Sequence, residues 1–147
     1  MLISRTIVTL IVVGACISPA LAQEEVPLFD GQGDATAYIA VDDDSTIYLW
    51  SGKPVAYLED DGNGGFHVYG FNGIHLGWLT GGVIRDHLGR VACAMKQRMR
   101  STNFEPFKAF KAFKPFKAFK EYAPFRPFLV DSWSEMPCSL LLGRGGA

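Results

Sequence analysis

Three histidines, His67, His75 and His87, are the residues best suited to acid-base chemistry, because imidazole titrates near neutral pH. They do not stand at a metal-ligand spacing, and the sequence has no C-x-x-C pair. Asp86 precedes His87 and could form half of an acid-base pair, but no motif marks a serine or cysteine nucleophile. We therefore expect no catalytic residue, cofactor or metal. The alternative is a hydrolase-like enzyme that uses Asp86, His87 or His75, which a pocket joining two histidines and an acid would favour.

Two acidic runs could offer oxygen ligands to calcium: Asp42-Asp43-Asp44, and Glu59-Asp60-Asp61 followed by Gly62-Asn63-Gly64. Neither run has the twelve-residue pattern with a distal glutamate that marks a calcium-binding loop. We expect both to be solvated loops between strands.

These residues lie in a stretch that repeats four times, which is the strongest signal in the chain. Each copy is marked by a glycine, with an apolar residue five positions earlier and a small residue four positions later. The glycines are Gly33, Gly52, Gly73 and Gly89, the apolar residues are Leu28, Ile47, Val68 and Ile84, and the small residues are Ala37, Ala56, Gly77 and Cys93. The small residue is followed by an aromatic one in three copies (Tyr38, Tyr57 and Trp78).

Each copy is predicted to be a hairpin of two strands joined by a tight turn. Asn72-Gly73 between apolar runs is the best such signal, because tight two-residue turns need positive φ. A lone hairpin cannot bury its apolar face, whereas four around one axis can, if each presents its small residue to the crowded centre. We therefore predict an all-β domain over residues 23–95 with a pseudo-four-fold arrangement. Two stacked sheets are the alternative.

A tail with a different sequence period, of three residues, occupies residues 104–128, after a basic linker over residues 96–103. An aromatic residue recurs at every third position: Phe104, Phe107, Phe110, Phe113, Phe116, Phe119, Tyr122, Phe125 and Phe128. This period and the prolines exclude an α-helix, so we expect a polyproline II-like or irregular tail. In polyproline II the rings would form one ridge and the following lysines another. Because soluble monomers avoid such apolar ridges, we expect the nine rings to be contact residues, covered by the domain or by a partner.

The charge is distributed very unevenly along the chain. From Gln23 to Met95 there are eleven acids and three bases, whereas from Lys96 to Phe128 there are nine bases and two acids. We expect the tail to lie against the acidic domain, in its own chain or in a neighbour's. An acidic domain is a poor match for nucleic acid.

The N-terminus has the pattern of a secretory signal peptide. Arg5 precedes a short apolar run, and Ala20-Leu21-Ala22 is a cleavage site, so we expect residues 1–22 to be removed and the protein to be periplasmic or secreted. The alternatives are a lipoprotein carrying its lipid on Cys16 and a retained anchor. In an oxidising compartment Cys93 and Cys138 could pair. The favoured interpretation leaves them unpaired, with Cys93 filling the small core position. Residues 129–147 are expected to be partly disordered.

Several phrases resemble the bacterial four-fold beta flower proteins. They are residues 50–58 (WSGKPVAYL), residues 68–78 (VYGFNGIHLGW), residues 84–90 (IRDHLGR) and the closing Ser132-Trp133-Ser134. The resemblance covers about residues 26–95 and extends into the tail, where this chain differs by carrying Phe in its triplets. It implies a compact flower of four β units and no catalytic residues.

Together these observations favour an exported, non-enzymatic structural or interaction module, whose tail packs on its own domain or on a partner. A homo-oligomer or a protein partner joined through the tail is the expected assembly. Binding of a membrane surface through the aromatic and cationic tail is the second alternative, since lysines with aromatic anchors bind anionic lipid.

Overall fold

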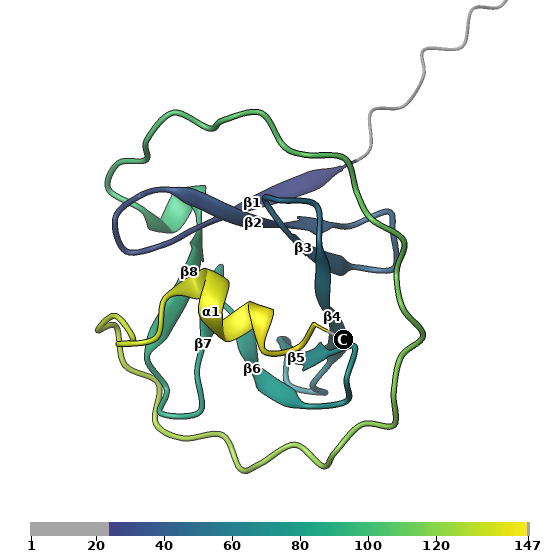
Figure 1. The fold of residues 1–147 in the computed structure, drawn as a ribbon. Helices are drawn as coiled ribbons and strands as arrows, with labels where there is room; N and C mark the ends of the chain where they lie inside the picture. The colour runs from purple at the N-terminus through teal and green to yellow at the C-terminus, as the bar shows by residue number, and fades with distance from the viewer. Residues whose placement is uncertain (1–23, 147) are drawn as a thin grey trace, which may run out of the picture.

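The computed structural model describes residues 24–146, in which eight strands form one closed barrel (Figure 1). The predicted signal peptide, its cleavage site and the alternative lipid site at Cys16 lie outside the described residues. Within residues 24–146, no helix has the length and apolar character needed to cross a membrane.

The strands follow one another around the barrel in chain order, each antiparallel to the next, and the last closes on the first. They are β1 (Glu25–Phe29), β2 (Ala35–Ala40), β3 (Thr46–Leu49), β4 (Pro54–Asp60), β5 (Phe66–Gly70), β6 (His75–Thr80), β7 (Val83–Arg85) and β8 (Val91–Met95). The predicted all-β domain of four hairpins is confirmed, and its closure excludes two stacked sheets.

The four hairpins share one register. In each, the apolar residue five positions before the marker glycine faces the small residue four positions after it: Leu28 with Ala37, Ile47 with Ala56, Val68 with Gly77, and Ile84 with Cys93. The pairing shifts by a bulge directly after that apolar residue in every copy. The small residues are all buried, and a Cβ on Gly77 would lie only 1.9 Å from the carbonyl oxygen of Arg85. The repeat in the sequence is therefore a repeat in space.

One apolar cluster joins the barrel to a short C-terminal helix, α1 (Cys138–Gly143). Seen along the barrel, α1 lies across its opening (Figure 1). Cys138, Leu141 and Leu142 of the helix are buried against residues of several strands, among them Leu28 and Ile47. The segment for which partial disorder was expected thus carries the element that closes one end of the barrel, and the sequence had not indicated this helix.

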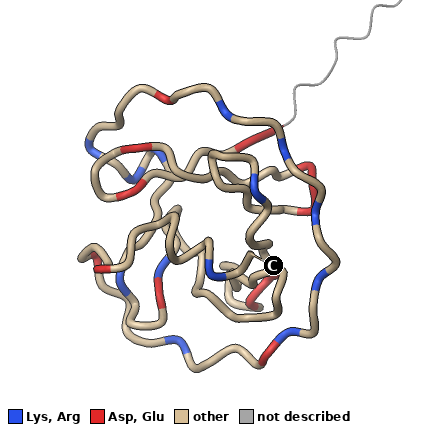
Figure 2. The backbone as a smooth tube through the Cα atoms, in the orientation of Figure 1, with Lys and Arg blue, Asp and Glu red and all other residues tan. Residues whose placement is uncertain are grey.

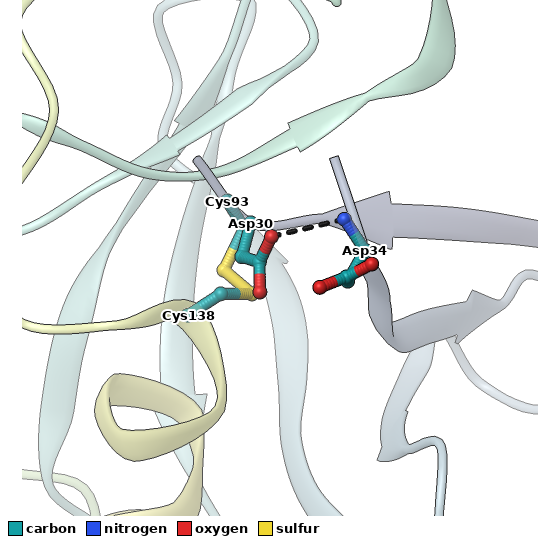
Figure 3. Close-up of a disulfide and its surroundings, with 4 residues drawn as sticks. All are labelled: Asp30, Asp34, Cys93 and Cys138. Carbon is teal, nitrogen blue, oxygen red and sulfur yellow. Dashed lines mark hydrogen bonds between the residues drawn. A yellow bond between two sulfur atoms is a disulfide. The ribbon is translucent and has the colours of Figure 1, made fainter. Parts of the chain in front are cut away.

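A disulfide between Cys93 and Cys138 ties α1 to β8 (Figure 3). The favoured interpretation of Cys93 as an unpaired filler of the small core position is therefore wrong. Cys93 does occupy that position, but its sulfur is bonded to a residue 45 positions further along the chain. Sequence spacing could not reveal the pair, because only the return of the chain to the barrel opening brings the two cysteines together.

The tail encircles the barrel. After a short 3-10 helix, η1 (Lys96–Arg98), residues 101–130 contain neither helix nor strand and run around the outside of the barrel as an open ring (Figure 1). The prediction of a non-α-helical tail is confirmed. We call residues 101–131 the strap.

We expect reduction of the Cys93–Cys138 bond to lower the free energy of unfolding by about 3–4 kcal/mol, because it releases a long loop in the unfolded chain. The measurement is urea unfolding with and without dithiothreitol. The Cys93→Ala/Cys138→Ala double variant is the control and should not respond to the reductant. Equal stability of the oxidised and reduced wild type would contradict the expectation.

Candidate functional site

The strap is held by the turns of the four hairpins at intervals of nine residues. Its backbone amides donate hydrogen bonds to the carbonyl oxygens of the marker glycines: Asn103 to Gly33 (2.8 Å), Ala112 to Gly52 (2.9 Å), Glu121 to Gly73 (2.9 Å) and Val130 to Gly89 (3.0 Å). Three triplets of the tail therefore correspond to one hairpin of the barrel. The period of three and the four-fold repeat are two parts of one arrangement.

The strap backbone also approaches these turns very closely. A Cβ on Gly52, Gly73 or Gly89 would lie 2.0 to 2.1 Å from a strap carbonyl oxygen, which belongs to Phe110, Phe119 and Phe128 respectively. The marker glycines additionally have φ between +80° and +88°. Glycine is thus required at these turns both for the left-handed backbone and for the space that the strap fills.

The strap lysines point towards the barrel and are paired with its carboxylates. Figure 2 shows the basic residues of the strap spread along the ring and acidic residues on the barrel beside it. The pairs are Lys108 and Lys111 with Glu25, Lys114 with Asp43, Lys117 with Asp44, and Lys120 with Glu59. In the fourth hairpin the direction is reversed, because buried Arg85 of the barrel binds Asp131 of the strap at 3.0 Å. The tail therefore lies on the acidic domain of its own chain, with five of its six bases paired there.

Tyrosines on the outside of the barrel lie beneath the same lysines. The ammonium group of Lys108 is 4.6 Å from the ring centre of Tyr38, and that of Lys117 is 4.2 Å from the ring centre of Tyr57. Such contacts are worth about 0.5–1 kcal/mol at exposed sites. Burial, followed by the nearby carboxylates Glu25 and Asp43, raises the pKa of Tyr38 to about 12. In the first two hairpins the aromatic position of the repeat therefore forms the surface on which strap lysines rest, whereas Trp78 of the third packs against His75 and His87.

The lysines also lower the pKa values of carboxylates that they bind. Burial raises the pKa of Glu25, but Lys108 and Lys111 outweigh burial and hold it below its usual value. The pKa of Asp43 is lowered in the same way, against burial, by hydrogen bonds from Lys114 and from the Tyr48 hydroxyl. Because these carboxylates are more acidic in the folded chain than in the unfolded one, their stabilisation is lost as the pH falls below their usual pKa values.

The aromatic residues of the strap point away from the barrel. Their exposed fractions range from 92% to 102% for Phe104, Phe107, Phe110, Phe113, Phe116, Phe119, Tyr122, Phe125 and Phe128. The part of the prediction that allowed these rings to be covered by the domain is wrong. The strap contacts the domain through its backbone and its lysines, since only one side of the triplet can face the barrel. We call these nine outward side chains the girdle.

The three histidines form a hydrogen-bonded chain on the outside of the third and fourth hairpins. Nδ1 of His67 lies 3.0 Å from Nε2 of His75, and Nδ1 of His75 lies 2.9 Å from Nε2 of His87. His75 is fully buried, next to Trp78, and its backbone amide donates to the Glu121 carboxylate of the strap at 2.7 Å. A neutral imidazole has one ring proton, so His75 donates to one neighbour and accepts from the other.

Burial, followed by the neighbouring His87 and His67, lowers the pKa of His75 to about 4. Burial also lowers the pKa of His87, with Arg144 adding to the effect. Both shifts favour the uncharged imidazole, and His75 is neutral near pH 7.

Within residues 24–146, no serine or cysteine is hydrogen-bonded to any of the three imidazoles. Asp86 Oδ1 accepts the backbone amides of Leu88 and Arg90, as Asp30 Oδ1 accepts those of Gln32 and Asp34 at the equivalent place of the first hairpin. Figure 3 shows one of the Asp30 bonds. Ser134 donates its hydroxyl to Asp86 and not to an imidazole. His87 lines a small cavity of about 160 Å³ with Asp86 and Arg144, but Asp86 serves there to hold the turn.

The two acidic runs are engaged within the chain. Asp43, Asp44 and Glu59 bind strap lysines, while Asp60 and Asp61 accept backbone amides of their own loop. In the part of the chain that the structure describes, no three His, Cys, Asp or Glu residues are placed to hold a metal ion. The strap partly covers the first run through Asp43 and Asp44. The second loop is exposed over residues 62–64, with nothing within 4 Å of a Cβ at Gly62 or Gly64, as expected of a solvated loop.

We expect Gly73→Ala to destabilise the protein by at least about 2 kcal/mol more than Gly62→Ala. Both glycines have positive φ, so both substitutions strain the backbone. Only at Gly73 would the new Cβ collide with the strap, since nothing lies within 4 Å of it at Gly62. Urea unfolding of the two variants measures the difference, and equal losses would show that strap docking contributes nothing there.

We expect the free energy of unfolding to fall by about 3 kcal/mol between pH 6.5 and pH 4. In this window the unfolded chain takes up a proton on His75, whose pKa in the folded chain is lowered from 6.5 to about 4. Stability is therefore higher above pH 6.5 and declines as the pH falls. Urea unfolding at several pH values tests this. A His75→Gln variant should have a shallower slope, and an unchanged slope would rule out His75 as its source.

The comparison with known proteins agrees with this geometry. No curated protein and no solved structure matches the chain. The family model described as "4-fold beta flower protein" matches residues 26–142, which include the strap and nearly all of the barrel and of α1. The chain therefore belongs to the 4-fold beta flower protein family.

Proposed function

We propose that this chain is an exported, non-enzymatic interaction module that presents its girdle to an apolar surface. The observation that carries the proposal is the orientation of the nine rings, each almost completely exposed. An exposed apolar patch of this size on a soluble protein marks an interaction site.

The charges of the strap favour an apolar partner over an anionic one. Each lysine from Lys108 to Lys120 faces the barrel and is paired with a carboxylate there. From Phe107 to Tyr122 the outward side of the strap therefore offers rings whose neighbouring lysines are bound by the barrel. Binding of anionic lipid needs cations near the membrane surface, and this pairing withdraws five of the six cations of residues 101–131, the sixth being Arg126. The membrane-surface alternative is correspondingly weaker.

Export is supported by the signal-peptide pattern and by the Cys93–Cys138 disulfide, because disulfides persist in oxidising compartments such as the periplasm. The absence of enzymatic activity is supported by what the candidate groups do. Asp86 holds a turn, and His75 is buried with both ring nitrogens bonded to other histidines. These two groups are thus engaged, and His87, which lines the small cavity, has Ser134 bonded to Asp86 and not to its ring.

We expect the protein to be retained on a phenyl resin in low salt, and the Phe113→Ser/Phe116→Ser/Phe119→Ser variant to elute early. These side chains touch nothing on the barrel, so the variant should keep the wild-type melting temperature. Phe66→Ser, at a partly exposed ring outside the girdle, is the control and should be retained.

Equal retention of the triple variant and the wild type would overturn the proposal. Vesicles provide a second comparison. Binding to anionic phosphatidylglycerol vesicles without retention on the resin would favour the membrane-surface alternative instead.

A further inference from the structure

The girdle has a geometry that suits one partner in particular, a second copy of itself. Its rings recur at every third residue without interruption from Phe104 to Phe128. At about 3.1 Å per residue, neighbouring rings along an extended strap are about 9 Å apart. Nine residues per hairpin imply about 36 residues for a full circle, which corresponds to a radius of about 18 Å at the same rise. The girdle is thus a row of evenly spaced aromatic rings around the rim of the barrel.

The gap between two neighbouring girdle rings has the width of one aromatic ring. The side chains diverge as they extend from the curved backbone, so a ring inserted midway between two neighbours would lie about 5 to 6 Å from each. Aromatic pairs favour separations of 4.5–7 Å between ring centres. The residue that separates each Lys from the next ring is small or compact, as Ala109, Ala112, Pro115 and Ala118 are. It leaves the gap open. A girdle therefore has both the rings and the ring-sized gaps needed to pack against a second girdle.

We propose that two copies of this chain associate edge to edge, with girdle rings of one copy inserted between girdle rings of the other. The inference rests on the proposed function of the girdle and names its partner. Repulsion between strap lysines does not oppose the contact from Phe107 to Tyr122, because these lysines are paired with barrel carboxylates on the inner side.

The area available is sufficient for a weak, specific contact. Two convex edges can bring about three rings from each copy together, and an aromatic side chain buries about 200 Å². Six rings would thus bury about 1,200 Å², at the lower end of stable protein interfaces. Because the girdle covers most of the circumference, one copy can form such a contact at more than one place, and the copies would spread in the plane of the barrel discs.

Two variants that each lose four rings distinguish insertion of rings into the gaps, which we call meshing, from non-specific apolar association. The alternate variant carries Phe107→Ser, Phe113→Ser, Phe119→Ser and Phe125→Ser, which doubles the spacing between neighbouring rings along the whole girdle. The block variant carries Phe104→Ser, Phe107→Ser, Phe110→Ser and Phe113→Ser, which leaves the regular spacing from Phe116 to Phe128. Both have five rings left, and neither loses a contact with the barrel, because all of these side chains are fully exposed.

We expect sedimentation velocity to show a wild type whose mean sedimentation coefficient rises with concentration. The block variant should still associate, whereas the alternate variant should associate at least about tenfold more weakly than the block variant. Equal weakening of the two variants would overturn meshing in favour of ring number alone. A wild type that is monomeric at every concentration would also overturn it. If that monomer is retained on the phenyl resin, the apolar interaction module stands and only its identification with a second copy fails.

Discussion

The structure depends on the close approach of the strap backbone to four glycine turns. At three of these turns a strap carbonyl oxygen occupies the place that a side chain would take, and at all four a strap amide binds the turn carbonyl. Because the turns are related by the pseudo-four-fold arrangement, the strap can meet all of them only if its own period divides the distance between them. Triplets do so, with three of them for each hairpin.

This constraint also decides which side of each triplet faces outwards. Once the backbone is fixed on the turns, the lysines reach inwards to carboxylates and tyrosines, and the aromatic rings have no surface to cover except that of another molecule. Exposed ion pairs contribute little individually, up to about 1 kcal/mol. Their larger effect is on orientation, because a triplet turned the other way would leave several carboxylates facing rings. Charge thus sets the direction in which the apolar surface is displayed.

The repeat likewise explains residues that look catalytic when read singly. Asp86 occupies the place of Asp30 in another hairpin and binds the same kind of backbone amides. The three histidines do come together, and no spacing rule for metals or triads would have found them, because they join through side chains on three different segments. Their neighbours include aromatic rings and one another, and burial, followed by His87 and His67, lowers the pKa of His75. The candidate site that remains is the girdle.

Much of the barrel could be read from the sequence, because local rules specify it: turn glycines need positive φ, and the small residue opposite each apolar one limits the bulk at the centre. The tail period and the opposite charges of the two halves likewise predicted a non-helical strap on an acidic domain. Three features could not be read in this way: the outward direction of Phe104 to Phe128, the bond between Cys93 and Cys138, and the helix that closes the barrel. Each depends on where the chain lies after it has travelled round the barrel. Only the folded path decides which side of a triplet is occupied and which distant cysteine is within reach.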